Sequence, residues 1–171
     1  MKRVGFVSIL ILVLLVFTFS DSAAQIGFKG VGGRLGFVAA DADQSGIIFG
    51  AHVNLGEIIP GLAIVPSLDY WSDDLDFLSI NGNVRYYFPS GGNIDLFAVG
   101  GLGFVRVSVP EVTVPGFGTV GGGSSTGIGL NLGAGAEIPL SDNLKGSAML
   151  IFNTEANQIK IMGGVTYMLG Q

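Results

Sequence analysis

Apolar residues in this chain alternate with glycine or polar residues over segments of about a dozen positions. This pattern restricts the possible folds more than any other feature of the sequence. In the clearest segment, 126–138, every second position from Ile128 to Ile138 is apolar. The positions between them carry glycine, Asn131 and Glu137. A period of two places alternate side chains on opposite faces of a β-strand, and such frequent glycines disfavour a helix. The pattern therefore predicts an all-β fold with two unlike faces.

Turn residues divide the chain at regular intervals. Clusters of Asp, Asn, Gly and Pro separate the alternating segments, which is typical of antiparallel hairpins. Eight strands are predicted, over about 27–40, 46–57, 62–72, 76–88, 94–109, 126–138, 144–153 and 158–169. An even number brings both ends of the domain to one side. The connections on that side are short (58–61, 89–93, 139–143), whereas 110–125 on the other side is long, an asymmetry typical of membrane barrels.

The N-terminal 24 residues have the layout of a secretory signal peptide. Lys2 and Arg3 precede an apolar run over 4–19, and Ser22 and Ala24 suit cleavage before Gln25. The run is shorter than the roughly 20 residues of a spanning helix and lacks a basic stop-transfer flank. We therefore expect residues 1–24 to be removed and 25–171 to form one domain.

The composition excludes several classes of protein. The chain is 49% hydrophobic but only 12% charged, and it contains 29 glycines and no cysteine. Disulfides and thiol chemistry are therefore absent. The net charge of −5 argues against nucleic acid as a partner, because phosphate binding depends on Lys and Arg.

The polar face of the predicted strands is poor in charge and rich in glycine, which suits the inside of a narrow barrel better than a surface in water. The opposite, apolar face suits lipid. The charged or titratable residues expected inside are Arg34, His52, Asp69, Arg85, Glu137, Lys145 and Lys160. They form either a core of ion pairs that fills the barrel or the lining of a pore. A soluble barrel with its apolar face inside is the alternative arrangement.

The fifth predicted strand has an ambiguous parity. Around Val99–Gly103 both faces are apolar or glycine, so Arg106 falls on different faces in different registers. We expect a bulge or a glycine kink there.

The connections on the long-loop side are acidic. Five of the carboxylates are Asp41, Asp43, Asp73, Asp74 and Asp76. They serve either to bind cations, shared with surrounding lipopolysaccharide phosphates, or simply to keep the loops soluble. The stretch 41–46 also resembles the start of a calcium loop, but position 52 is His rather than the bidentate Glu, and a hairpin turn explains the same residues. The segment 110–125 is expected to be a flexible glycine-rich loop.

The sequence shows no catalytic motif. His52 is the only histidine, it is expected in mid-strand on the inward face, and no nucleophile motif such as G-x-S-x-G accompanies it. We therefore expect a chain that is not an enzyme and has no cofactor and no metal.

The predicted strand segments 81–88 and 161–167 resemble those of a known class of membrane protein. Asn-Gly-Asn-Val-Arg-Tyr-Tyr-Phe and Ile-Met-Gly-Gly-Val-Thr-Tyr resemble the strands of small outer-membrane β-barrels of the OmpA and OmpX type, over about 26–169. The resemblance implies an eight-stranded antiparallel up-and-down transmembrane barrel in the outer membrane, with recognition by the barrel-assembly machinery. Family members commonly end on Phe or Tyr, whereas here four residues follow Tyr167.

Together these features predict a non-enzymatic outer-membrane barrel, monomeric, surrounded by lipid and lipopolysaccharide, with a structural or surface-interaction role. A narrow porin-like channel for small solutes or ions is the first alternative. A soluble periplasmic barrel that binds an apolar ligand is the second.

Overall fold

The computed structural model describes residues 26–40, 44–89, 91–109, 111–116, 118–155 and 157–169. The predicted signal peptide, Asp41 and Asp43 lie outside these residues. The described residues contain β-strands and connecting segments. None of them forms a helix long and apolar enough to cross a membrane.

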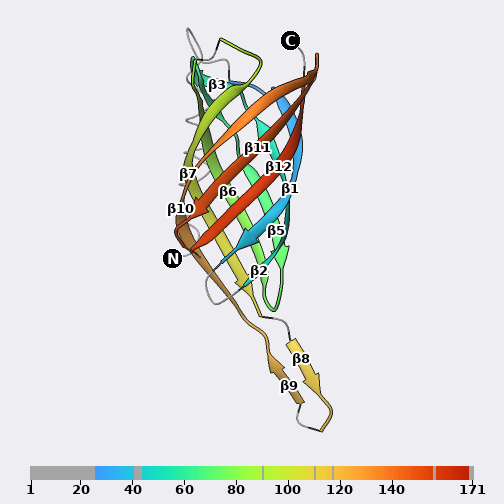
Figure 1. Ribbon diagram of the computed structural model, residues 1–171. Coiled ribbons are helices and arrows are strands. Elements are labelled where there is room, and N and C mark those ends of the chain that lie inside the picture. Colours follow the sequence, from blue (N-terminus) through green and yellow to red (C-terminus); the bar gives the residue numbers. More distant parts are fainter. Residues whose placement is uncertain are drawn as a thin grey trace.

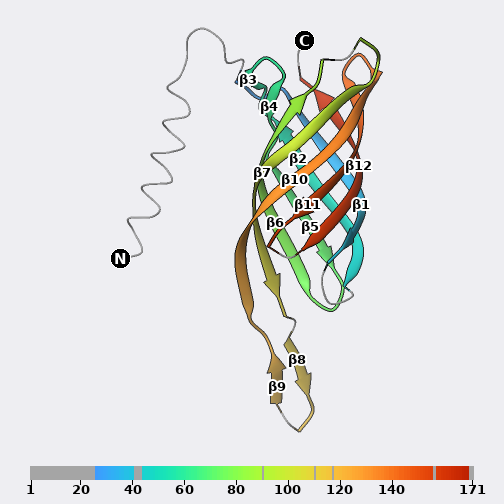
Figure 2. The same ribbon diagram turned by 60° about the vertical axis from the view of Figure 1, so that its left-hand side comes forward.

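The strands wind into a closed, tilted barrel (Figures 1 and 2). Their bounds are β1 Gly30–Ala39, β2 Ser45–Asn54, β3 Glu57–Ile59, β4 Leu62–Ile64, β5 Ser67–Ser72, β6 Asp76–Tyr87, β7 Asp95–Ser108, β8 Glu111–Val114, β9 Gly118–Gly121, β10 Ser124–Ser141, β11 Leu144–Asn153 and β12 Gln158–Met168. Each strand pairs antiparallel with its barrel neighbours, and β12 pairs with β1 over the full length of β1, which closes the sheet. Closure leaves the barrel without an unpaired edge.

The predicted eight-stranded barrel is confirmed, with one predicted strand divided in two. β4 and β5 pair with β6 in the same continuous register, from Leu62 opposite Tyr86 to Ser72 opposite Asp76. Between them lies Pro66, which has no N–H to donate to a ladder. The barrel order is therefore β1, β2, β4–β5, β6, β7, β10, β11, β12. The short β3 pairs with β4 through the Pro60–Gly61 turn, where Gly61 has a φ of 81° that favours glycine.

Alternate residues face the lumen and the outside, as the period of two predicts. In β10, Leu130 and Leu132 are 52% and 56% exposed, while Asn131 between them is 1% exposed. The inside, however, is not only glycine and polar side chains. Ten buried apolar residues also lie there: Val38, Ile48, Trp71, Phe77, Phe97, Val99, Val105, Met149, Ile151 and Met162.

The expected bulge in the fifth predicted strand is wrong. β7 pairs without a register shift with β6 on one side and with β10 on the other. Phe97, Val99 and Val105 face inward, and Arg106 faces outward. The parity is ambiguous in the sequence because this strand contributes both to the apolar part of the lumen and to the apolar outer wall.

The long connection is also more ordered than expected. β8 and β9 pair from Glu111 opposite Gly121 to Val114 opposite Gly118, so part of the predicted flexible loop is a β-hairpin. Gly116 in its turn and Gly118 at the start of β9 have φ angles of 86° and 87°. Figures 1 and 2 show this hairpin projecting beyond the barrel, at the end opposite β3 and the last residues of β12. We call the hairpin side the loop end and the opposite side, where β1 begins and β12 ends, the terminal end.

Candidate functional site in the barrel lumen

A buried ion-pair cluster occupies the middle of the lumen. Arg34 of β1 donates from Nε to Oδ1 of Asp69 in β5 at 2.8 Å, and its Nη2 donates to the same oxygen and to Ser67. Asn81 donates to Oδ2 of Asp69 at 2.9 Å. Lys160 of β12 lies 3.8 Å from that oxygen. These charges are all 5% exposed or less, so each depends on its partners rather than on water.

A row of asparagines crosses the lumen beside this cluster. Asn131 of β10 donates to both Asn81 and Asn83 of β6 at 2.9 Å. Asn153 of β11 donates to Oδ1 of Asn131 at 2.7 Å and accepts from the backbone N–H of Glu155. A buried amide is costly unless its donors and acceptors are satisfied, and this row satisfies most of them internally. Gly103 leaves room for the row, because a Cβ there would overlap the amides of Asn81 and Asn153.

A second ion cluster lies at the terminal end. Glu137 near the end of β10 contacts Nη1 of Arg85 at 3.4 Å and Nζ of Lys145 at 2.9 Å. The hydroxyl of Tyr87 reaches the same carboxylate at 3.4 Å. The guanidinium of Arg85 also lies 4.8 Å from the ring centroid of Phe97, in cation–π geometry. Lys145 is the partly exposed member, at 29%.

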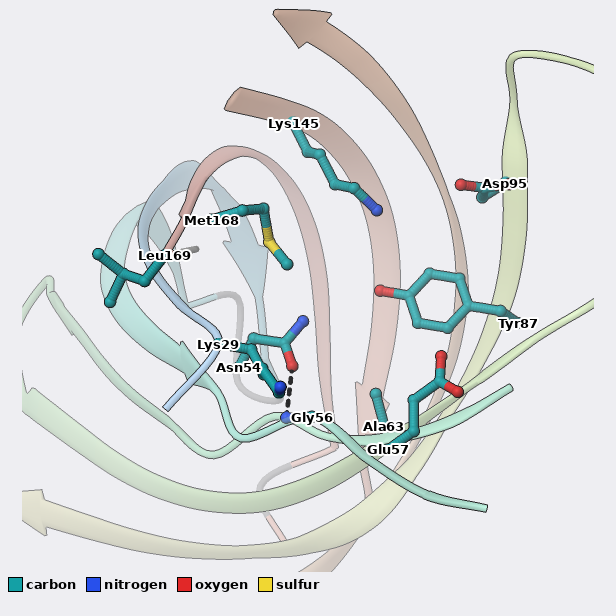
Figure 3. A pocket seen from close by; sticks show the side chains of 10 residues that line it. All are labelled: Lys29, Asn54, Gly56, Glu57, Ala63, Tyr87, Asp95, Lys145, Met168 and Leu169. Carbon is teal, nitrogen blue, oxygen red and sulfur yellow. Dashed lines mark hydrogen bonds between the residues drawn. The ribbon is translucent and has the colours of Figure 1, made fainter. Parts of the chain in front are cut away.

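The terminal end opens into a shallow cavity of about 520 Å³ (Figure 3). Lys145 and Tyr87 line its inner side, and Lys29, Glu57 and Asp95 lie around it. The backbone N–H of Gly56 donates to Asn54 at 2.8 Å on its rim. Glu137, which bridges Arg85 and Lys145, is only 4% exposed, so the cavity is a vestibule that ends at the ion cluster.

Apolar side chains close the lumen toward the loop end. Trp71 and Phe77 stack in parallel with ring centroids 4.0 Å apart, and Val38, Ile48 and Val105 belong to the same buried group. A continuous water-filled passage would leave its lining exposed to solvent. The described lining residues of the middle and loop-end parts are instead almost completely buried, which does not favour the channel alternative.

His52 is buried at 2% exposure, and its Nε2 lies 2.8 Å from the hydroxyl of Thr166 in β12. Among the residues that the structure describes, no group of three His, Cys, Asp or Glu side chains could hold a metal ion.

The acidic loop residues are dispersed over different environments. Asp73 and Asp74 are exposed in the β5–β6 turn. Asp76 begins β6 and accepts a hydrogen bond from the Tyr70 hydroxyl at 2.7 Å. Of the five expected carboxylates, therefore, the described structure places two together in solvent and one in a strand.

Sequence reasoning did not single out several residues of the lumen. Ser67, Gln158 and Thr166 are buried polar residues that contact or adjoin the ion-pair cluster and His52. Gln158 and Thr166 could have been found from parity alone, because their positions differ from that of Lys160 by two and by six on the same strand.

No family model matches this chain, and no curated protein matches it. Solved structures do. The N-terminal β-barrel domain of OprF from Pseudomonas aeruginosa is 15% identical, with a TM-score of 0.63 over 84% of this chain and 99% of that one. Neisserial surface protein A is 16% identical, with a TM-score of 0.63 over 87% and 100%. Ail, the attachment invasion locus protein of Yersinia pestis, solved with the heparin analogue sucrose octasulfate, is 16% identical with a TM-score of 0.57 over 83% and 97%. The chain therefore has the fold of the small eight-stranded outer-membrane barrels.

Proposed function

We propose that this chain is a non-enzymatic integral protein of the outer membrane, with a lumen filled by side chains and a structural or surface-interaction role. The observation that carries the proposal is the outer wall of the barrel. Every strand of the closed barrel presents large apolar side chains outward. Examples spread around the wall are Leu35, Phe49, Leu68, Ile80, Leu102, Leu132, Leu150 and Ile161, between 48% and 60% exposed.

Such a wall is unfavourable in water and favourable in hydrocarbon. Each apolar Å² kept in water costs about 25 cal/mol, and contiguous apolar surface on this scale marks a lipid or partner interface. Closure also satisfies the backbone hydrogen bonds between strands, which lipid cannot replace. A soluble binder of an apolar ligand needs the reverse arrangement, with polar residues such as Arg85 outside and Leu132 inside.

Aromatic pairs lie near the ends of this apolar wall. Tyr86 and Phe88, at the terminal end of β6, meet edge to face with centroids 5.3 Å apart. Phe49 of β2 and Tyr70 of β5 are also 5.3 Å apart on the outer face. Aromatic residues at both borders of the hydrocarbon layer are typical of membrane barrels, because one edge of a tyrosine is apolar and the other is polar.

The loop end supports a role at the cell surface. The β8–β9 hairpin extends beyond the barrel, and exposed Asp73 and Asp74 lie in the neighbouring β5–β6 turn. Arg106 is exposed on the outer face near the loop end of β7. We propose that this end faces outward, with Arg106 and divalent cations on the acidic turn contacting lipopolysaccharide phosphates.

Fractionation of cells tests the membrane assignment. We expect the protein to remain in the membrane fraction through carbonate and salt washes, to require detergent for release, and to migrate differently on gels before and after heating. Release by carbonate alone would show a peripheral or soluble protein and would overturn the proposal.

Epitope insertion tests the orientation. A tag inserted in the β8–β9 turn at Gly116 is expected to bind antibody on intact cells. The matched control is the same tag in the short β10–β11 turn at Asp142, which should bind antibody only after the outer membrane is permeabilised. The opposite accessibility would invert the assigned topology.

Planar-bilayer recording tests the closed lumen. Because the lining charges are buried and paired, we expect no discrete openings from the purified barrel. Reproducible single-channel steps would revive the channel alternative.

The biogenesis of the chain is part of the same proposal. We propose that residues 1–24 are removed, that the barrel-assembly machinery inserts residues 25–171, and that the product is a monomer. Intact-mass measurement of protein from the envelope should give a chain beginning at Gln25. Light scattering in detergent should give one chain per micelle, and depletion of the assembly machinery should lower the amount of heat-modifiable protein.

A further inference from the structure

Three buried side chains near the loop end of the lumen have polar atoms without a hydrogen-bond partner. These atoms are the amide nitrogen and the amide oxygen of Gln158, the indole N–H of Trp71 and the hydroxyl of Ser79. Gln158 and Trp71 are 0% exposed and Ser79 is 1% exposed. Unsatisfied buried polar atoms cost free energy, so a cluster of them points to something that they bind.

Strand register places these three residues beside one contact that crosses the lumen, or two residues from it. The contact between Lys160 and Asp69 joins β12 to β5, which are not neighbours in the barrel, so it crosses the lumen. Gln158 lies two residues from Lys160 toward the loop end, and Trp71 lies two residues from Asp69 in the same direction. Both therefore lie on the loop-end side of that contact. Ser79 is the pairing partner of Asp69 on β6.

The indole of Trp71 is oriented with its N–H edge away from β2. A Cβ on Gly46 of β2 would meet Cε3 and Cζ3 of the indole, on the edge opposite its N–H. One ring face stacks on Phe77. Asn153, the pairing partner of Gln158, directs its amide toward Asn131 and the backbone N–H of Glu155, and neither amide atom of Gln158 has a hydrogen-bond partner.

Basic side chains outnumber carboxylates in the ion-pair cluster beside these three residues. Asp69 is the carboxylate shared by Arg34 and Lys160, and its two oxygens already accept hydrogen bonds from Arg34 and Asn81. Lys160 lies 3.8 Å away, a Coulomb contact longer than a hydrogen bond. Two buried basic side chains share one buried carboxylate, so with both in their charged form one positive charge remains to be balanced.

We propose that the loop-end part of the lumen is a binding site for a small monovalent anion of halide size. The ammonium of Lys160 supplies the charge, and the Trp71 N–H, the Ser79 hydroxyl and the Gln158 amide N–H supply uncharged donors. An ammonium, an indole N–H, a hydroxyl and an amide N–H can all donate to one anion. The Gln158 carbonyl oxygen accepts from a water bound alongside. The site lies between the ion-pair cluster and the apolar layer, where a paired anion is shielded from solvent.

The test uses Trp71, which is the only tryptophan in the chain. The barrel is refolded in detergent in sodium fluoride, chloride, bromide or iodide at constant ionic strength, and its fluorescence is recorded. Bromide and iodide quench tryptophan on contact. We expect a loss of Trp71 fluorescence that saturates with iodide concentration and is reversed by chloride. The uncharged quencher acrylamide should have little effect, because Trp71 is buried.

Matched variants locate the effect. Lys160→Met and Gln158→Leu should each weaken the apparent iodide affinity by about tenfold or more, the range expected when a charged or buried donor is lost. Lys29→Met, the same change at the terminal end, should leave it unaltered. Heat-modifiable migration shows which variants fold. If Lys160→Met does not fold, Gln158→Leu still tests the proposal.

Quenching that rises linearly without saturation, or that is equal in Lys160→Met and in the unmodified chain, would overturn the proposal. So would the absence of quenching by any halide, which would indicate that no anion meets these polar atoms. None of these results bears on membrane insertion, which the fractionation test decides separately.

Discussion

Asp69→Asn should be among the most destabilising conservative substitutions in this chain. The carboxylate accepts two N–H groups of Arg34 and the amide of Asn81, and it lies 3.8 Å from Lys160. The substitution removes the negative charge and turns an amide donor toward Asn81 or Arg34. Two buried cations then remain without a carboxylate.

The expected cost follows from this geometry. Removing one partner of a buried ion pair costs about 3–5 kcal/mol, because the remaining charge has neither water nor counter-charge. With a urea m-value of about 2 kcal/mol/M, the unfolding midpoint should fall by about 2 M. Trp71 fluorescence in lipid vesicles reports the transition, and gel migration without heating provides an independent measure of folding.

Asp73→Asn is the matched control for Asp69→Asn. Asp73 is exposed in the β5–β6 turn, so the same chemical change there should alter the stability by no more than about 0.5 kcal/mol. The double variant Asp69→Asn with Lys160→Met should recover part of the loss, because it removes one of the two uncompensated cations. A loss below about 1 kcal/mol for Asp69→Asn would refute the view that the buried carboxylate holds these cations.

Three further predictions concern the wall, the strand packing and the loops. Leu132→Arg, in the middle of β10, should lower the stability in lipid by about 2–4 kcal/mol, measured by urea unfolding in vesicles, and Leu132→Ile should have a small effect. Gly36→Ala should reduce the yield of heat-modifiable barrel, because its Cβ would overlap a backbone carbonyl of β12, whereas Gly82→Ala has open space around it; equal yields would contradict the packing argument. Asp73→Asn with Asp74→Asn should weaken divalent-cation binding measured by calorimetry, and unchanged binding would leave these residues only a role in loop solubility.

Much of the barrel could be predicted because its local signals agree. Alternation in 126–138 assigned Leu132 to the outer wall and Glu137 to the lumen without any knowledge of partners, since a strand has only two faces. The turn clusters located β11 and β12 to within a residue or so, because Asn, Asp and Gly mark the places where a hairpin reverses.

The sequence pattern predicted the structure wrongly in two places. One is a strand whose two faces are chemically alike, and the other is a connection that forms a β-hairpin of its own. In β7, inward Phe97 and Val99 look no different in sequence from outward Leu96 and Leu102, so only pairing with β6 and β10 sets the parity. The glycine-rich segment was expected to be irregular, yet β8 and β9 pair, because backbone hydrogen bonding across a glycine turn needs no apolar pattern.

The sequence by itself determined the strands, the two faces and the set of polar residues that enter the lumen, because these properties depend only on the period of the pattern and on turn chemistry. The tertiary structure alone decided which of these residues meet. Arg34, Asp69 and Lys160 belong to three strands. Arg34 and Asp69 both lie opposite Gly50 of β2, and the register with which β12 closes on β1 brings Lys160 within reach of Asp69. Register is a property of the whole closed sheet, and no local segment encodes it.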